Sequence, residues 1–223
     1  MRARAVDPRV GSDASVRPRG ARPGLCFDRR VSDDPALPPL RPRRSGDLVL
    51  RAPTEADVPD VMVWRNRPEV ARWLLRTTMT EAEVLGRFRE RPVWTVPVAV
   101  EHGGRVVGTA FVDVLDGMGQ DGGTEHLRSE GLVGYLFDPD VHGRGFATRT
   151  LEVLLEIAFA DLGLRRVTAG CFADNIASWR VMEKAGMRRE QHGVRDSWHA
   201  ELGWVDGLTY GLLREEWAAR GSG

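Results

Sequence analysis

The stretch 138–147 combines glycine, arginine and histidine in a spacing suited to binding a bulky anion. It reads Asp-Pro-Asp-Val-His-Gly-Arg-Gly-Phe-Ala. Gly143 and Gly145 let the backbone approach a ligand closely. A helix is predicted to follow directly, and its first amides have no intrahelical partners and no Ser, Thr or Asn side chain to cap them. Together with the positive end of the helix dipole and Arg144, these amides predict a pyrophosphate site.

The glycine spacing separates this stretch from two common nucleotide-binding motifs. No Gly-Lys-Ser/Thr follows, as the P-loop requires, and the third glycine of the dinucleotide fingerprint is missing. ATP and NAD are therefore poor candidates for the ligand. Two glycines in a strand-to-helix turn also occur for purely structural reasons, so the interpretation depends on the surrounding elements.

Hydrophobic periodicity places the anion site at the junction of a strand and a helix. A strand is predicted over 131–137, and an apolar stripe over 151–162 predicts a helix. A second strand over 165–172 and a second helix over 175–185 follow, with Gly186 at the helix C-terminus. The site therefore lies inside a strand-helix-strand unit.

Antiparallel elements flank this unit, so the predicted fold is a mixed α/β sheet. The four residues 102–105 (His-Gly-Gly-Arg) indicate a hairpin turn. Residues 116–130 and 195–206 are predicted to be polar loops. The remaining predicted strands cover 48–50, 94–100, 106–115, 187–193 and 207–213. Three further helices are predicted to begin near Thr54, Pro68 and Thr80, and a short last helix contains Trp217.

Charge is unevenly distributed along the 223 residues, although the formal net charge is zero. Residues 1–46 contain eleven Arg, five Asp and seven of the thirteen prolines, and so carry a charge of 11 − 5 = +6. A segment with so few large apolar residues cannot offset the entropy of ordering, and we expect a disordered extension. Residues 47–223 are then one domain with a charge of about −6, which argues against nucleic acid as its principal ligand.

Cysteine content and hydropathy indicate a cytoplasmic protein without membrane contact. Cys26 and Cys171 are too few for a disulfide framework or a multi-thiolate metal site. The longest apolar stretches fall short of the roughly 18 residues that a membrane span needs. The N-terminus also lacks the apolar core of a secretory signal. The histidines and carboxylates of 192–206 do not have the spacing of a compact metal site, so no metal is expected.

Several motifs resemble those of the GNAT acetyltransferase superfamily. Residues 142–147 look like its acetyl-CoA signature Gln/Arg-x-x-Gly-x-Gly/Ala, with His142 at a position that usually holds Gln or Arg. The segments 134–136, 175–187 and 64–70 are similar to the RimJ and RimL branch. The resemblance covers about residues 47–217. It implies a central mixed, mostly antiparallel twisted sheet with a splayed strand pair and flanking helices.

The resemblance also implies where acetyl-CoA binds. The pantetheine arm is expected between the strands 131–137 and 165–172, and the pyrophosphate on the amides that follow. An amide near Leu136 would stabilise the charge that develops on the thioester carbonyl. By resemblance, the residues expected to contact acetyl-CoA are Tyr135, Leu136, Phe137, His142, Gly143, Arg144, Gly145, Phe146, Ala147 and Asn175. Asn at position 175 would equally serve as a helix N-cap.

Two residues are predicted to handle protons. Many GNAT enzymes protonate the leaving thiolate with a tyrosine at the position that here holds Met182, and Ser178 is the replacement candidate. Its alternative role is that of a helix hydroxyl bonded to backbone. Glu130 is the preferred candidate for the general base. RimJ and RimL relatives often carry Glu at the position that here holds Leu132, and in a regular strand Glu130 faces the same side as that residue. The alternative role of Glu130 is that of a solvated strand-end carboxylate. Asp113, Glu125, His126 or a chain of water molecules are the alternatives for the base.

The sequence therefore predicts an acetyl-CoA-dependent N-acetyltransferase that works by direct attack of a primary amine in a ternary complex. The amine belongs to a protein N-terminus or to a small cationic molecule, and the acidic domain favours the latter. A homodimer is compatible with the resemblance. Two alternatives stay open: a catalytically silent acyl-CoA sensor, suggested by Met182 and Leu132, and a nucleic-acid or ribosome-binding module that acts through the Arg-rich extension.

Overall fold

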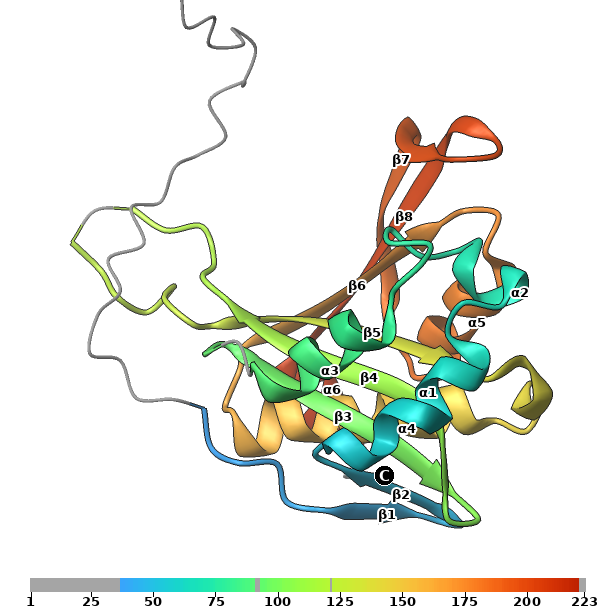
Figure 1. Cartoon of the computed structure of the whole chain (residues 1–223). Coiled ribbons are helices and arrows are strands. Elements are labelled where there is room, and N and C mark those ends of the chain that lie inside the picture. The colour runs from blue at the N-terminus through green and yellow to red at the C-terminus, as the bar shows by residue number, and fades with distance from the viewer. Residues whose placement is uncertain (1–36, 91–92, 121, 221–223) are drawn as a thin grey trace, which may run out of the picture. The chain divides into compact units, whose positions relative to one another are not determined.

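A computed structural model describes residues 37–90, 93–120 and 122–220. Eight strands form one sheet (Figure 1). They are β1 (Arg43–Ser45), β2 (Leu48–Arg51), β3 (Thr95–His102), β4 (Arg105–Leu115), β5 (Glu130–Phe137), β6 (Arg166–Phe172), β7 (Arg188–His199) and β8 (Gly203–Leu213). Their order is β1-β2-β3-β4-β5-β6-β8-β7, and every neighbouring pair is antiparallel except β5 and β6. The predicted mixed, mostly antiparallel sheet is confirmed.

Helices pack on both faces of the sheet. The α-helices are α1 (Val58–Trp64), α2 (Pro68–Ala71), α3 (Glu81–Arg89), α4 (Phe146–Glu156), α5 (Ile176–Lys184) and α6 (Arg214–Arg220). Short 3-10 turns occupy Glu55–Asp57 and Pro139–Val141, and a π-helical turn, Ile157–Asp161, ends α4. Within the described ranges, none of these helices has the length and apolarity to cross a membrane.

Two apolar clusters show which helix lies on which face. The larger cluster joins α4 and α5 to alternate residues of the central strands on one side of the sheet. The smaller cluster joins α1 and α3 to Ala99 of β3 and Val106 of β4, and these helices lie on the opposite side of the sheet (Figure 1). Trp64 of α1 is fully buried in this cluster. Because side chains alternate along a strand, this opposite face continues over β5, β6 and β8, and we call that part the open face.

The first strand lies inside the segment that the sequence assigned to the extension. Arg43 of β1 pairs with Leu50 of β2, and its guanidinium forms ion pairs with Glu156 and Asp161 at the end of α4. The ordered sheet therefore begins before residue 47, because backbone pairing and ion pairs to a distant helix hold this short polar strand. The predicted extension falls mostly in residues 1–36, which lie outside the described residues.

The hairpin of β7 and β8 is longer than the sequence predicted. The segment 195–206, expected to be a polar loop, is mostly strand, and Trp198 lies directly opposite Trp204 across the hairpin. The loop prediction was wrong because cross-strand pairing compensates for the low strand propensity of these polar residues.

Candidate functional site

A slot opens between β5 and β6. The two parallel strands pair only over three positions, from Glu130 opposite Arg166 to Leu132 opposite Thr168. β5 nevertheless continues to Phe137 and β6 continues to Phe172. The backbone groups beyond Leu132 that face the slot have no cross-strand partner there. They are available to a ligand that carries amide groups.

The predicted anion site lies at a helix N-terminus beside the slot. α4 begins at Phe146, and its N-cap, Gly145, has φ 74° and provides no capping side chain. Gly143 is also left-handed, with φ 76°. A Cβ added to either glycine would meet no atom within 4 Å. The space in front of the free amides is therefore open, and it fits a bulky anion such as a pyrophosphate.

We call the backbone from Gly143 to Ala147, with the open space in front of it, the cradle. Charged side chains surround its mouth. Arg144 Nη2 lies 3.2 Å from His102 Nε2 and 3.9 Å from Asp47 Oδ2, and its guanidinium stacks 4.6 Å above the ring of Phe146. Arg149 Nη2 donates to Asp47 Oδ1 at 2.8 Å, and this hydrogen bond lowers the pKa of Asp47. Two guanidinium groups share one carboxylate, which leaves the mouth suited to a negatively charged ligand.

The remaining predicted cradle residues have different environments. His142 is exposed, Ala147 is half-buried and Phe146 is buried in the core. Phe137 is also buried in the core, so its backbone is the part that can face the slot. Leu136 points to the opposite side and packs against the cluster of α1 and α3.

Ser178 lies beside the slot in contact with Tyr135. The Tyr135 hydroxyl donates to the Ser178 backbone carbonyl at 3.1 Å and lies 3.4 Å from the Ser178 Oγ. Burial raises the pKa of Tyr135 well above its ordinary value, so the phenol stays protonated at neutral pH. Burial also raises the pKa of the neighbouring Cys171 to about 11, although a hydrogen bond from Ser178 acts in the opposite direction. Sequence reasoning did not foresee this contact between two hydroxyl groups.

The start of α5 has the geometry of a capped helix. Asn175 is the N-cap, and its Oδ1 accepts from the Ser178 N–H at 3.2 Å. This cap fixes the first turn of the helix and thereby the position of Ser178. Met182, one turn further on, is buried in the core and offers no proton.

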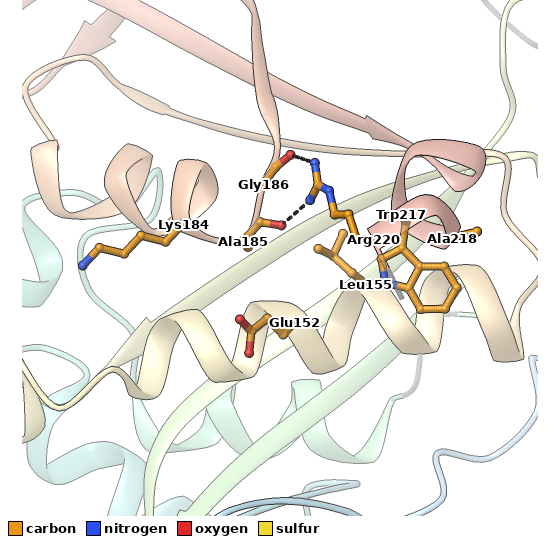
Figure 2. A pocket seen from close by; sticks show the side chains of 8 residues that line it. All are labelled: Glu152, Leu155, Lys184, Ala185, Gly186, Trp217, Ala218 and Arg220. Atoms are coloured by element: carbon orange, nitrogen blue, oxygen red, sulfur yellow. Dashed lines mark hydrogen bonds between the residues drawn. The ribbon is translucent and has the colours of Figure 1, made fainter. Parts of the chain in front are cut away.

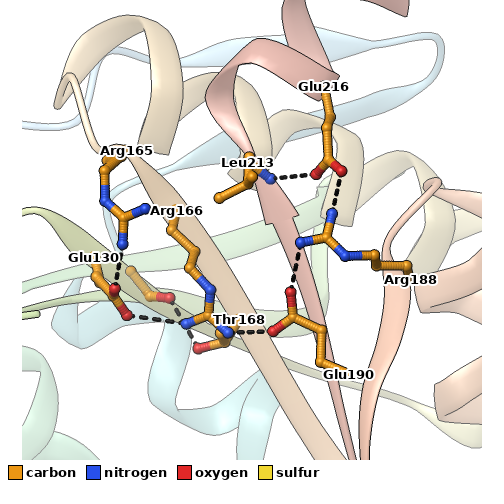
Figure 3. A network of polar contacts seen from close by, with 9 residues as sticks. Glu130, Arg165, Arg166, Thr168, Arg188, Glu190, Leu213 and Glu216 are labelled. Atoms are coloured by element: carbon orange, nitrogen blue, oxygen red, sulfur yellow. Dashed lines mark hydrogen bonds and ion pairs between the residues drawn. The ribbon is translucent and has the colours of Figure 1, made fainter. Parts of the chain in front are cut away.

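Glu130 lies at the closed end of the slot, within a network of charges (Figure 3). Its two carboxylate oxygens accept from Arg165 at 2.7 Å and from Arg166 at 2.9 Å. Arg166 also pairs with Glu190 of β7. Glu130 precedes Tyr135 by five residues on β5, which places them roughly 16 Å apart along the strand. The structure therefore does not bring Glu130 together with Ser178.

One cavity lies away from this slot. It has a volume of about 740 Å³ and is lined by residues of α4, of the end of α5 and of α6 (Figure 2). Arg220 reaches across it and donates to the carbonyls of Ala185 and Gly186, so its guanidinium is already engaged. The cavity lies beside the C-terminal end of α5, whereas the cradle is at the N-terminus of α4.

Metal-binding groups are not gathered at the site. Across 37–90, 93–120 and 122–220, no three His, Cys, Asp or Glu side chains are placed to hold one ion. His192 instead pairs with Asp206 through Nε2 and Oδ2 at 2.7 Å. His199 is buried against the rings of Trp73 and Phe172.

The family profile described as "Acetyltransferase (GNAT) domain" matches residues 47–188, which include both the slot and the cradle. The chain belongs to this family. The uncharacterized N-acetyltransferase YnaD of Bacillus subtilis is 36% identical over 85 residues, which cover 38% of this chain and 49% of YnaD. The match thus spans about half the length of that relative.

Solved structures of GNAT proteins share the fold. The ribosomal-protein-S5-alanine acetyltransferase from Vibrio fischeri superposes with a TM-score of 0.66 at 16% identity, covering 79% of this chain and 98% of that one. AAC(6')-Ib in complex with ribostamycin and coenzyme A gives a TM-score of 0.61 at 22% identity, covering 77% and 96%. At these identities the likeness is one of fold.

Proposed function

We propose that this protein transfers the acetyl group of acetyl-CoA to a primary amine by direct attack while both substrates are bound. Members of the family use acetyl-CoA. The observation that carries the proposal is the unpaired slot between β5 and β6, which leads to an uncapped helix N-terminus with two left-handed glycines. A long ligand with amide groups in its arm and a pyrophosphate at its end matches both features.

Each part of the slot has a role in binding. The amides from Gly143 to Ala147 would hold the pyrophosphate, with the Arg144 guanidinium and the exposed His142 beside it. The backbone of 135–137 would pair with the amides of the pantetheine arm, and Asn175 lies at the other wall. Bulky side chains at the glycines would block this approach.

Bound acetyl-CoA supplies a thioester that is activated toward attack by an amine. A backbone N–H near Leu136 would stabilise the negative charge that develops on the carbonyl oxygen. Ser178 donates a proton toward the departing sulfur, and the Tyr135 hydroxyl, 3.4 Å from its Oγ, orients that group. A neutral amine is the nucleophile, and its proton must pass to a base or to water after attack.

The acceptor is a protein N-terminal amine or a small cationic amine. Similarity to the RimJ and RimL motifs favours the first, and the acidic domain favours the second. In either case we propose that catalysis resides in the domain from Arg43 onward, and that the Arg-rich extension is dispensable for it.

The test is release of coenzyme A thiol from acetyl-CoA by the full chain, because truncation at residue 47 would remove β1. Acceptors would include N-terminal peptides, aminoglycosides, amino acids and aliphatic amines. Release with one class establishes the activity. Tight acetyl-CoA binding without release for any acceptor would favour the silent sensor instead, and steeply salt-dependent RNA binding would favour the nucleic-acid module.

A further inference from the structure

The open face carries a carboxylate that has no cationic partner. Glu130 and Glu190 are each paired with arginine there. Asp196, by contrast, has no Arg, Lys or His within ion-pair distance in the described part of the chain. Its one hydrogen-bond partner is the neighbouring Ser197, whose hydroxyl donates to Oδ1 at 2.9 Å. Asp196 therefore keeps an uncompensated negative charge.

An irregularity in β7 directs Asp196 onto this face. The pairing of β7 with β8 shifts register between Gly193 and Ser197, so the intervening residues bulge from the ladder. Arg195 takes a left-handed conformation with φ 49°. Its N–H donates to Asp206 Oδ1 at 2.9 Å, which holds the bulge in place.

The Asp196 carboxylate rests over two facing glycines. Gly193 of β7 pairs with Gly207 of β8, and neither has a side chain to cover the backbone. A Cβ added to Gly207 would lie 2.6 Å from Asp196 Oδ1, and one added to Gly193 would clash with the same carboxylate. The carboxylate thus lies over the backbone that the two glycines leave uncovered, while Asp196 itself is exposed on the open face.

This uncovered backbone lies beside the unpaired part of β6. Thr168 is the last residue of β6 that pairs with β5, and Phe172 lies four residues beyond it. Phe172 pairs with Gly207 and shares its face. Since neighbouring strands are about 4.8 Å apart, Asp196 lies roughly 5–10 Å from the β6 edge of the slot.

Aromatic side chains form a wall beside the two glycines. The His199 ring packs against Phe172 at 5.1 Å and against Trp73, which follows α2, at 5.6 Å between ring centroids. Arg72 and Glu201 pair across the same contact at 3.3 Å. On the strand next to the two glycines, Gly170 is exposed. The sheet backbone at Gly170, between the wall and the slot, is therefore accessible to a ligand.

We propose that Asp196 is a specificity-determining residue that binds a positive charge on the acceptor. The acceptor is then an aliphatic amine with a second cationic group roughly 5–10 Å from the nitrogen that is acetylated. This inference rests on the proposed acetyl transfer at the slot. The carboxylate attracts such an acceptor, and an acidic acceptor would meet an unpaired like charge.

The test compares 1,4-diaminobutane with butylamine, which has the same chain length and one charge fewer. In Asp196→Asn the KM for the diamine should rise about fivefold, while the KM for butylamine and both kcat values stay near wild type. Asp196→Glu should restore part of the preference. Glu215→Gln, which removes an exposed charge on α6, is the matched control and should change neither KM.

A binding measurement separates this inference from the proposed function. Calorimetry of the full chain with 1,4-diaminobutane, without acetyl-CoA, should show binding that weakens in Asp196→Asn and persists in Glu215→Gln. That result supports the inference even if no acetyl transfer is found, in which case the proposed function alone fails. The inference would be overturned by equal losses for the two amines in Asp196→Asn, by absence of diamine binding to the wild type, or by diamine binding that is unchanged in Asp196→Asn.

Discussion

The Tyr135 hydroxyl donates a hydrogen bond to the backbone carbonyl of Ser178, 3.1 Å away and 43 residues distant in the sequence. This contact ties α5 to the edge of β5 where the two parallel strands part. It places two hydroxyl groups beside the slot, and the proposed transfer needs a proton donor for the leaving sulfur.

Replacing Ser178 by alanine should separate catalysis from binding. We expect kcat to fall about 100-fold, the lower end of what a positioned proton donor contributes. The affinity for coenzyme A should stay near wild type, because the Asn175 cap uses the backbone N–H of residue 178. Steady-state kinetics and calorimetry would measure the two quantities.

A second variant decides which hydroxyl is the donor. Tyr135→Phe keeps the ring and removes the hydroxyl, and a positioning role predicts a smaller loss of kcat than in Ser178→Ala. A larger loss in Tyr135→Phe, with Ser178→Ala near wild type, would transfer the donor role to Tyr135. Ser129→Ala serves as a control, because it removes a hydroxyl that donates to the backbone carbonyl of His126.

Glutamate at position 145 should remove acetyl-CoA binding. Gly145→Glu puts a negative charge and a side chain into the open space of the cradle, and like charges brought together cost several kcal/mol. We expect the dissociation constant of acetyl-CoA to rise about 100-fold or more. Titration calorimetry measures this change directly.

The control for this variant uses another left-handed glycine. Gly122 has φ 92° and open space around it, so Gly122→Glu carries similar backbone strain outside the cradle. Its affinity for acetyl-CoA should match that of the wild type. Unchanged binding in Gly145→Glu would show that the pyrophosphate site has been misplaced.

The cradle could be predicted from sequence because its determinants are local. Two glycines, a missing cap and an apolar helical stripe lie within one continuous segment, and Gly143 and Gly145 have the left-handed angles that glycine readily adopts. The hairpin turn at 103–104 and the capping box at Thr80 are local in the same way. Each depends on residues within a few positions of one another.

Other features could not be predicted because they depend on distant partners. β1 is held by backbone pairing with β2 and by the ion pair of Arg43 with Glu156 of α4, and its own short polar sequence reveals neither. The bulge that directs Asp196 is a register shift between two strands, which an alternating pattern does not encode. Gly193 and Gly207 were the available signal, since glycines within strands often mark a bulge or a close approach.

Glu130→Gln should lower stability more than rate. Both carboxylate oxygens are bound by arginines at the closed end of the slot, so we expect the free energy of unfolding to fall by about 1 kcal/mol. The value of kcat should stay within about twofold of wild type. Denaturant unfolding and steady-state kinetics test the two effects; a loss of kcat above tenfold with unchanged stability would instead make Glu130 the general base.

Cys171 should be a slow target for alkylation despite its position beside the slot. Because burial raises the pKa of this thiol to about 11, about one molecule in a thousand carries the reactive thiolate at pH 8. The iodoacetamide labelling rate of the Cys171 peptide, followed by mass spectrometry, should rise about tenfold per pH unit until the pH reaches the pKa.

The Ser178 hydroxyl stabilises the Cys171 thiolate, so Ser178→Ala should raise the pKa of the thiol further and slow labelling at any pH below that pKa. Cys171→Ala should retain acetyl transfer, since the amine attacks the thioester directly. Fast labelling near pH 7 together with an inactive Cys171→Ala variant would point to a covalent acyl-enzyme instead.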